Sequence, residues 1–160
     1  VLGICGGFQM LGERIDDPQG LESDPGSSQG LGWLAMSTEL IAGKQLANTK
    51  GKLLASGSPV QGYEIHNGIT RGEALSRPML MLGDRYDGAM SEDGQLMGCY
   101  LHGLFDVADS GNAILAWAGL HDNRSVDYAA HREQQLDRLA DMVESHMDMT
   151  ILQEAISRAD

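Results

Sequence analysis

The first twelve residues constrain the fold of this chain more than any other segment. They read Val-Leu-Gly-Ile-Cys-Gly-Gly-Phe-Gln-Met-Leu-Gly. Strand-like residues run directly into Cys5, and two glycines and an amphipathic helical stretch follow. This order predicts a strand, a sharp turn and a helix, the arrangement in which a nucleophile elbow lifts a reactive side chain above the edge of a sheet. The sequence therefore predicts an α/β fold with Cys5 as its candidate nucleophile.

The residues around the two cysteines differ in kind. We expect Gly6 and Gly7 to be required beside Cys5 because a Cβ atom there would collide with the strand or helix packed alongside. Cys99 instead alternates with apolar neighbours, which predicts a small core residue. Two cysteines in unrelated contexts do not make a disulfide framework.

A histidine at the end of a later predicted strand is the candidate base. Residues 94–102 read as a strand that ends at His102, and Gly103 lets the chain turn away. A histidine at the C-terminal end of a strand can reach a nucleophile on a parallel neighbour. The sequence therefore predicts that this strand lies beside the strand that precedes Cys5. The alternative interpretation is a histidine that merely completes a strand end.

The charge balance argues against several kinds of partner. The 160 residues include 11 Lys and Arg against 23 Asp and Glu, a formal net charge of −12. Such acidity argues against nucleic acid and anionic membrane surfaces. We expect no metal site because no histidines or cysteines show ligand spacing. A reducing cytoplasm is the expected location because it suits a free reactive thiol.

The rest of the pattern predicts strands first and helices last. The helix after Cys5 is expected to reach about Arg14, and residues 15–32, rich in Gly, Ser, Pro and Asp, to form a long surface loop. Strands are expected at 33–41, 52–55, 60–68, 78–82 and 94–102, with 86–93 turn-like. Helices are expected from Asp109 or Ser110 to Gly119, along 128–147, and from Thr150. The predicted organisation is one α/β unit with a C-terminal helical tail.

The opening segment resembles the type I glutamine amidotransferases, whose signature is a glycine-flanked cysteine followed four positions later by glutamine. Cys5, Gly7 and Gln9 match this pattern. The resemblance implies that Cys5 attacks the side-chain amide of glutamine and that Gln9 contacts this substrate. It further implies that the Gly6 N–H helps to hold the oxyanion, while His102 transfers protons. An ordinary helix residue is the alternative interpretation of Gln9.

One position departs from the type I pattern. That family usually places a glutamate two residues after the histidine, where it orients the ring, and here the position is Leu104. Either Cys5 and His102 work as a pair, or another acid takes over. Glu64, on the strand-like segment Gly-Tyr-Glu-Ile-His, is the candidate acid, although it could equally anchor the turn that follows.

Further motifs resemble the amidotransferase domains of the cobyric acid synthases. They are Asp16-Asp17-Pro18 with Glu22-Ser23, Gly62-Tyr63-Glu64-Ile65-His66-Asn67-Gly68, Tyr100-Leu101-His102-Gly103-Leu104-Phe105-Asp106, and Leu136-Asp137-Arg138-Leu139-Ala140-Asp141. The resemblance assigns no role to His66. It implies a flavodoxin-like sheet and the amidation of corrin-ring carboxylates with glutamine as nitrogen donor.

The same resemblance sets expectations for the parts outside this sequence. ATP and Mg²⁺ would be used by an N-terminal synthetase domain, and no phosphate-binding Gly-Lys-Ser/Thr loop occurs in residues 1–160. We therefore expect residues 1–160 to be the C-terminal part of an amidotransferase domain with an incomplete sheet. By itself this part is expected to have little or no glutaminase activity.

Two alternative functions remain open from the sequence. One is a glutaminase subunit that serves another acceptor, such as a cell-wall lipid precursor. The other is a non-catalytic domain that kept the fold, against which the retention of both Cys5 and His102 counts.

Overall fold

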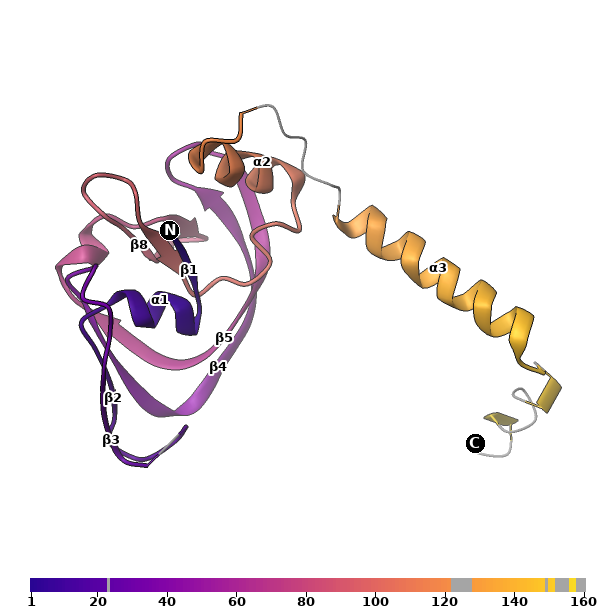
Figure 1. Ribbon diagram of the computed structural model, residues 1–160, viewed down its shortest axis with the longest axis horizontal. Coiled ribbons are helices and arrows are strands. Elements are labelled where there is room, and N and C mark those ends of the chain that lie inside the picture. The colour runs from indigo at the N-terminus through magenta and orange to yellow at the C-terminus, as the bar shows by residue number, and fades with distance from the viewer. Residues whose placement is uncertain (23, 122–127, 149, 152–155, 158–160) are drawn as a thin grey trace. The chain divides into compact units, whose positions relative to one another are not determined.

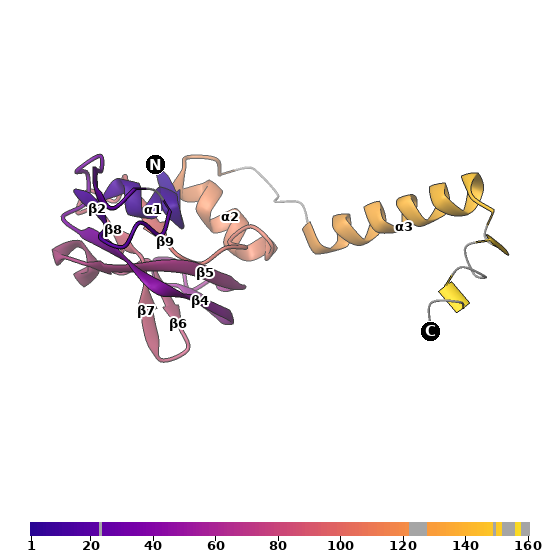
Figure 2. The ribbon, with the colours of Figure 1, turned by 90° about the horizontal axis from the view of Figure 1, so that it is seen from below.

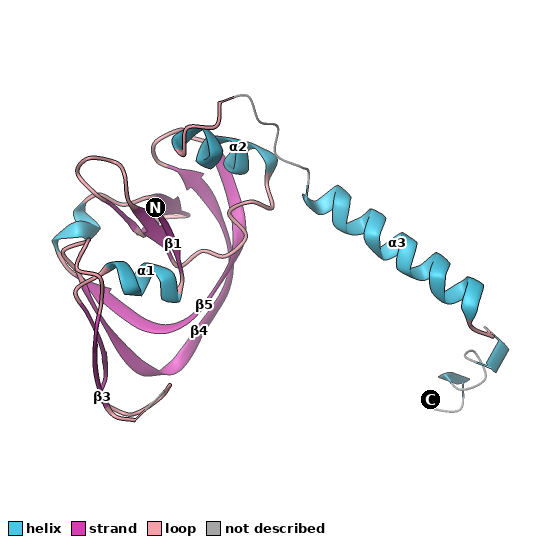
Figure 3. Ribbon diagram, in the orientation of Figure 1, coloured by secondary structure: helices cyan, strands magenta, loops and turns pink. Residues whose placement is uncertain are grey.

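The computed structural model describes residues 1–22, 24–121, 128–148, 150–151 and 156–157. The chain divides into two compact units, Val1–Ser125 and Val126–Asp160, and each has its own internal structure. In the described residues, the strands belong to the first unit, together with two helices (Figures 1 and 3). The helices are α1 (Gly6–Leu11), α2 (Ala108–Trp117) and α3 (Tyr128–His146). Among the described helices, none combines the length and the apolar character that crossing a membrane requires.

A small sheet brings the two predicted site strands together. Its order is β1-β9-β8, formed by β1 (Leu2–Ile4), β9 (Met97–Cys99) and β8 (Ala89–Met90). β1 and β9 run parallel, with Ile4 opposite Cys99, whereas β8 is antiparallel to β9. The predicted parallel pairing is therefore confirmed. The regular strand ends at Cys99, however, and His102 follows in a separate bridge to another strand.

Helix α1 packs closely on this sheet over two strand glycines. A Cβ atom on Gly3 would lie 2.7 Å from the carbonyl oxygen of Gly7, and one on Gly98 would lie 2.6 Å from the Phe8 ring. Both strand glycines are therefore required. By contrast, nothing lies within 4 Å of the Cβ positions of Gly6 and Gly7. The expectation that these two glycines avoid a collision is wrong, because the close approach falls on the strands below the helix.

A larger sheet has the order β3-β2-β4-β6-β7, and β5 also pairs with β4. Its strands are β2 (Arg14–Asp17), β3 (Gly26–Gln29), β4 (Ser37–Leu53), β5 (Pro59–Arg71), β6 (Leu80–Leu82) and β7 (Arg85–Asp87). A 3-10 turn, η1 (Glu73–Ser76), follows β5. The antiparallel pair of β4 and β5 curves around α1 and the small sheet, and the hairpin of β6 and β7 projects from it (Figures 1 and 2). A register shift between Leu40 and Gln45 interrupts the pairing, and such irregularities bend strands.

Several predicted boundaries are wrong, and strand pairing explains them. Helix α1 ends at Leu11 instead of near Arg14, where β2 begins. The predicted loop 15–32 contains most of the antiparallel β2–β3 pair, and the turn-like segment 86–93 contains β8 and the end of β7. Local turn residues suggested loops, but hydrogen bonds to partner strands decided the conformation.

The core of the first unit consists of two buried apolar clusters. One includes Leu80, Cys99 and Ile114 of α2, and the other includes Phe8 and Tyr100. Cys99 has no exposed surface, so its predicted role as a core residue is confirmed.

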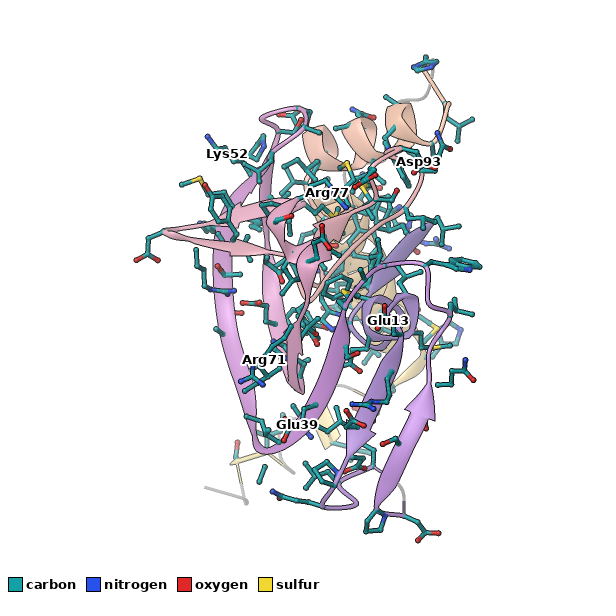
Figure 4. All side chains as sticks on the ribbon, turned by 90° about the vertical axis from the view of Figure 1, so that its left-hand side faces the viewer. Glu13, Glu39, Lys52, Arg71, Arg77 and Asp93 are labelled. Carbon is teal, nitrogen blue, oxygen red and sulfur yellow. The ribbon has the colours of Figure 1, made fainter. Side chains whose placement is uncertain are left out.

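Charged side chains on the first unit form exposed ion pairs. Arg71 and Glu39, labelled in Figure 4, pair across β5 and β4 at 3.9 Å. Arg77 pairs with Glu92 at 3.3 Å. Exposed pairs of this kind contribute little to stability, so the fold depends mainly on the two buried clusters.

The helices confirm the predicted change of pattern near residue 109 but not the predicted cap. Helix α2 follows Val107, and Ser110 lies inside the helix. Its hydroxyl donates to the carbonyl oxygens of Leu104 and Val107 at 2.6 and 2.9 Å. Helix α3 confirms the long second helix, while the helix predicted from Thr150 lies largely outside the described residues.

Candidate active site

Cys5 sits in a strained turn between β1 and α1. Its backbone has φ 54° and ψ −115°, and no other non-glycine residue in the described part of the chain has a positive φ. Such a conformation costs about 1–3 kcal/mol and persists only where the surrounding structure holds it. The Cys5 N–H donates to the Cys99 carbonyl at 2.9 Å, and its own carbonyl accepts the Gln9 N–H at 3.1 Å. The turn therefore has the geometry of the predicted elbow.

The Cys5 thiol faces strand β5. Its Sγ donates to the carbonyl oxygen of Ile65 at 3.7 Å, and the residue is partly exposed. Gly6 follows at the first position of α1, where backbone N–H groups have no partner within the helix. The open space beside Gly6 leaves room for a bound molecule next to Cys5.

His102 is held against the same strand, at Tyr63. The two residues exchange backbone hydrogen bonds of 2.8 and 3.2 Å, and their rings stack with centroids 4.9 Å apart. A Cβ atom on Gly62 would overlap the His102 carbonyl oxygen, and Gly103 turns the chain away with φ +91°. Backbone and ring contacts therefore both fix the position of this histidine.

Cys5 and His102 share β5 as a common wall. Cys5 contacts Ile65, and His102 pairs with Tyr63 two residues earlier. No hydrogen bond joins the thiol and the imidazole among the described residues, and the buried Nε2 of His102 has no partner there. Distances between nucleophile and base are often longer in enzymes without substrate. The Nε2 nitrogen of His102 therefore has a hydrogen-bonding position that no described residue fills.

Glu64 lies on β5 between Tyr63 and Ile65, but its carboxylate forms an ion pair with a residue of another strand. Its side chain is buried and forms an ion pair with Arg85 of β7. Successive residues of a strand point to opposite faces, so Glu64 points away from the face on which Tyr63 stacks on His102. No hydrogen bond from Glu64 to the His102 ring occurs among the described residues.

Gln9 lies one helical turn after Cys5 and is also turned toward β5. Its Nε2 donates to the Tyr100 hydroxyl at 3.2 Å, and the residue is buried. A Cβ atom on Gly68 would come within 2.5 Å of this nitrogen. Three of the predicted site residues, Cys5, Gln9 and His102, therefore contact β5 between Tyr63 and Gly68.

Sequence reasoning assigned no function to other residues that support this region. Asp87 is buried, and its Oδ2 accepts the backbone N–H groups of Tyr100 and Leu101 at 3.1 and 3.3 Å. Burial, with the Glu64 carboxylate as a second cause, raises the pKa of Asp87. Asp87 stands in a segment that looked like an ordinary turn, so no local signal could have revealed its role.

The motif residues His66 and Asn67 also gain a structural context. The His66 ring stacks on Tyr100 with centroids 3.7 Å apart, and its Nδ1 lies 3.0 Å from the Gly68 carbonyl oxygen. The buried Oδ1 of Asn67 has no partner among the described residues. A cavity of about 270 Å³ adjoins this segment. It is lined by residues that include Phe8, His66, Thr70, Tyr86, Asp87 and Tyr100.

No group of three or more His, Cys, Asp or Glu side chains among the residues described could hold a metal ion. The described groups that contact this wall are a thiol, an imidazole and a side-chain amide.

The structure contains an elbow, a parallel neighbour strand and a histidine beyond that strand. These are the features expected of an α/β amidotransferase domain. The comparison with known families agrees. Residues 1–110 match the CobB/CobQ-like glutamine amidotransferase domain, and this span is more than half of the 160 residues. The chain belongs to this family of glutamine amidotransferase domains. The mixed α/β structure is consistent with the flavodoxin-like fold of such domains.

Proposed function

We propose that this chain is the glutaminase part of a cobyric acid synthase and that Cys5 and His102 carry its glutamine hydrolysis. The observation that supports this most is the joint placement of the two residues. Cys5 occupies a strained elbow after β1, and His102 follows the parallel strand β9, with both held against β5.

The proposed reaction begins with attack of the Cys5 thiolate on the side-chain amide carbon of glutamine, which forms a carbon–sulfur bond. The negative charge moves to the amide oxygen, where the Gly6 N–H donates a hydrogen bond. The His102 imidazolium protonates the amide nitrogen, the carbon–nitrogen bond breaks, and ammonia leaves. Neutral His102 next removes a proton from water, which attacks the thioester. Glutamate leaves, and the thiolate of Cys5 is restored.

Two further residues have proposed roles in this reaction. Gln9 would contact the substrate glutamine, which agrees with its position one turn after Cys5. Glu64 is the proposed acid that orients His102, although its side chain lies on the opposite face of β5 from Tyr63. Its ion pair with Arg85 supplies the competing structural role. Glutaminase activity at least about tenfold lower in Glu64→Gln, without unfolding, would support orientation. An unchanged rate would leave Cys5 and His102 as a pair.

The proposed acceptor is a corrin-ring carboxylate. Support comes from the family match and from the motifs shared with cobyric acid synthases, which extend beyond the matched span into α3. In this proposal the released ammonia serves an ATP- and Mg²⁺-dependent synthetase domain, and the reaction takes place in the cytoplasm.

The decisive experiment treats the full-length protein with 6-diazo-5-oxo-L-norleucine, a reactive analogue of glutamine. Mass spectrometry should find a single label at Cys5, and the protein should release glutamate from glutamine. Labelling at Cys99, or hydrolysis that persists in Cys5→Ala, would overturn the proposal. Amidation of a corrinoid carboxylate with glutamine and ATP tests the acceptor. Amidation of a cell-wall lipid precursor instead would assign the other acceptor class.

A further inference from the structure

A buried chain of hydrogen bonds runs from Gln9 into the larger sheet. Gln9 Nε2 donates to the Tyr100 hydroxyl oxygen at 3.2 Å, and this oxygen lies 2.6 Å from Thr70 Oγ1. Thr70 in turn lies 2.7 Å from Thr38 Oγ1, its register partner across β5 and β4. Gln9, Tyr100 and Thr38 are all buried. The chain thus links the helix that follows the nucleophile to the framework of the sheet.

Packing holds Tyr100 in the position that this chain requires. The His66 ring stacks on one side at a centroid distance of 3.7 Å, and Phe8 meets the ring edge-on at 5.3 Å. Asp87 anchors the backbone N–H of Tyr100. The Tyr100 hydroxyl therefore presents a fixed acceptor to Gln9.

This arrangement determines which end of the Gln9 amide remains available. The amide nitrogen is engaged by Tyr100, and the described part of the chain supplies no donor to Oε1. A side-chain amide oxygen accepts hydrogen bonds and cannot donate them. Gln9 therefore offers an acceptor to a bound molecule.

The spacing between Cys5 and Gln9 suits one particular donor of the substrate. Gln9 lies one turn beyond Cys5, because its N–H donates to the Cys5 carbonyl at 3.1 Å, and one helical turn rises about 5.4 Å. In glutamine, four bonds separate the amide carbon that Cys5 attacks from the α-nitrogen, which spans roughly 5 Å when extended. The α-ammonium can thus reach Gln9 while the amide carbon reaches Cys5.

We propose that Tyr100 is a positioning residue for substrate selection. By holding the Gln9 nitrogen, it turns the Gln9 oxygen toward the α-ammonium group of the substrate. This inference rests on the proposed glutaminase function and goes beyond it by naming Tyr100 as the residue that positions Gln9.

The test compares two reagents on the full-length protein. 6-Diazo-5-oxo-L-norleucine carries an α-ammonium group, whereas iodoacetamide alkylates the same thiol without one. In Tyr100→Phe, which keeps the ring, we expect labelling of Cys5 by the amino-acid reagent to slow by about three- to tenfold, the effect of one hydrogen bond. Alkylation by iodoacetamide should remain unchanged. The KM for glutamine should rise by a similar factor with little change in kcat.

Two further variants separate this role from general damage. Thr70→Val removes the next link and should slow labelling in the same direction. Tyr86→Phe makes the same chemical change at an exposed tyrosine that lines the same cavity, and it should leave both reagents unaffected. Equal slowing of both reagents in Tyr100→Phe, no slowing of either, or an identical effect of Tyr86→Phe would overturn the inference. If 6-diazo-5-oxo-L-norleucine does not label Cys5 in the wild-type protein while iodoacetamide still alkylates it, the proposed function is overturned. The role of Tyr100 is then overturned with it.

Discussion

Two cysteines stand at the ends of neighbouring parallel strands, and their surroundings differ completely. Cys99 is the last residue of β9, and Cys5 lies one position beyond its partner Ile4 on β1. Cys5 has a positive φ and a partly exposed thiol that faces β5. Cys99 has extended-strand geometry, no exposed surface and a thiol directed to the Leu101 carbonyl at 3.6 Å.

The difference teaches that one residue along a strand decides whether a thiol serves packing or chemistry. Burial is the main cause that raises the pKa of Cys99, and the Asp87 carboxylate adds to it. A thiol in that state is inert because the thiolate is the reactive form. The sharp turn carries Cys5 out of the sheet and places it at the start of α1.

The most direct way to break this comparison is to remove each thiol in turn. Cys5→Ala should abolish glutamate release because no other group can form the thioester. Cys99→Ala should remain within a few-fold of wild type, since it loses only buried contacts and some stability. Glutamate production by the full-length variants measures both. Comparable losses in the two variants would contradict the assignment.

Strand β9 leads to His102, just as strand β1 leads to Cys5. His102→Ala should lower glutamine hydrolysis by about 10²–10⁴-fold, the range for loss of a general acid–base group. Amidation driven by added ammonia should persist because it does not need the glutaminase step.

His131→Ala is the matched control for this substitution, since His131 is exposed on α3. It should leave hydrolysis unchanged. Equal loss of the glutamine- and ammonia-driven reactions in His102→Ala would assign His102 a structural role instead.

Chemical modification sharpens the comparison without any substitution. In the folded protein, iodoacetamide should alkylate Cys5 at least about a hundredfold faster than Cys99, because Cys99 becomes accessible only when the structure opens. Peptide mapping after timed alkylation measures both rates. The two rates should converge in denaturant, and similar rates in the folded protein would contradict the burial argument.

The smallest expected effect concerns Asp87, which holds the backbone just after Cys99. Its pKa is raised by burial and by Glu64. Such an acid contributes stability below its unfolded pKa, and this contribution is lost as pH rises through the folded pKa. The side chain of the Asp87→Asn variant does not titrate. The free energy of unfolding of this variant should therefore increase relative to wild type as pH rises from about 4, the pKa of an aspartate in the unfolded chain.

Asp93→Asn provides a control of opposite sign. The pKa of Asp93 is lowered, chiefly by the Ser91 hydroxyl, so its charged form is the favoured one and this variant should lose stability relative to wild type as pH rises. Urea denaturation between about pH 4 and 7 measures the Asp87 trend, whereas the Asp93 trend lies below about pH 4, its unfolded pKa, and is measured there. A pH-independent difference between wild type and Asp87→Asn would contradict the predicted linkage.

The elbow and the strand that leads to His102 could be predicted from the amino-acid sequence alone. Cys5 between a short apolar run and an amphipathic stretch can form few structures other than strand, turn and helix, and the parallel pairing of β1 with β9 confirms the predicted neighbour strand. The burial of Cys99 was also readable, because its neighbours alternate in the manner of a core strand. The elbow and the burial of Cys99 are local features, so a short window of residues contains their cause, whereas the pairing of β1 with β9 joins segments that are far apart in the sequence.

Only the tertiary structure decided which residues surround the site. The pairing of Tyr63 with His102 joins positions 39 residues apart, and the hydrogen bond of Gln9 with Tyr100 joins positions 91 apart. The predicted loop after α1 forms β2 and β3, which pair with each other, and β2 also pairs with β4. Glu64 looked free to orient a histidine, yet Arg85 on β7 takes up its carboxylate. The packing of the sheets determines which residues contact His102, Gln9 and Glu64. No local sequence pattern predicts these contacts.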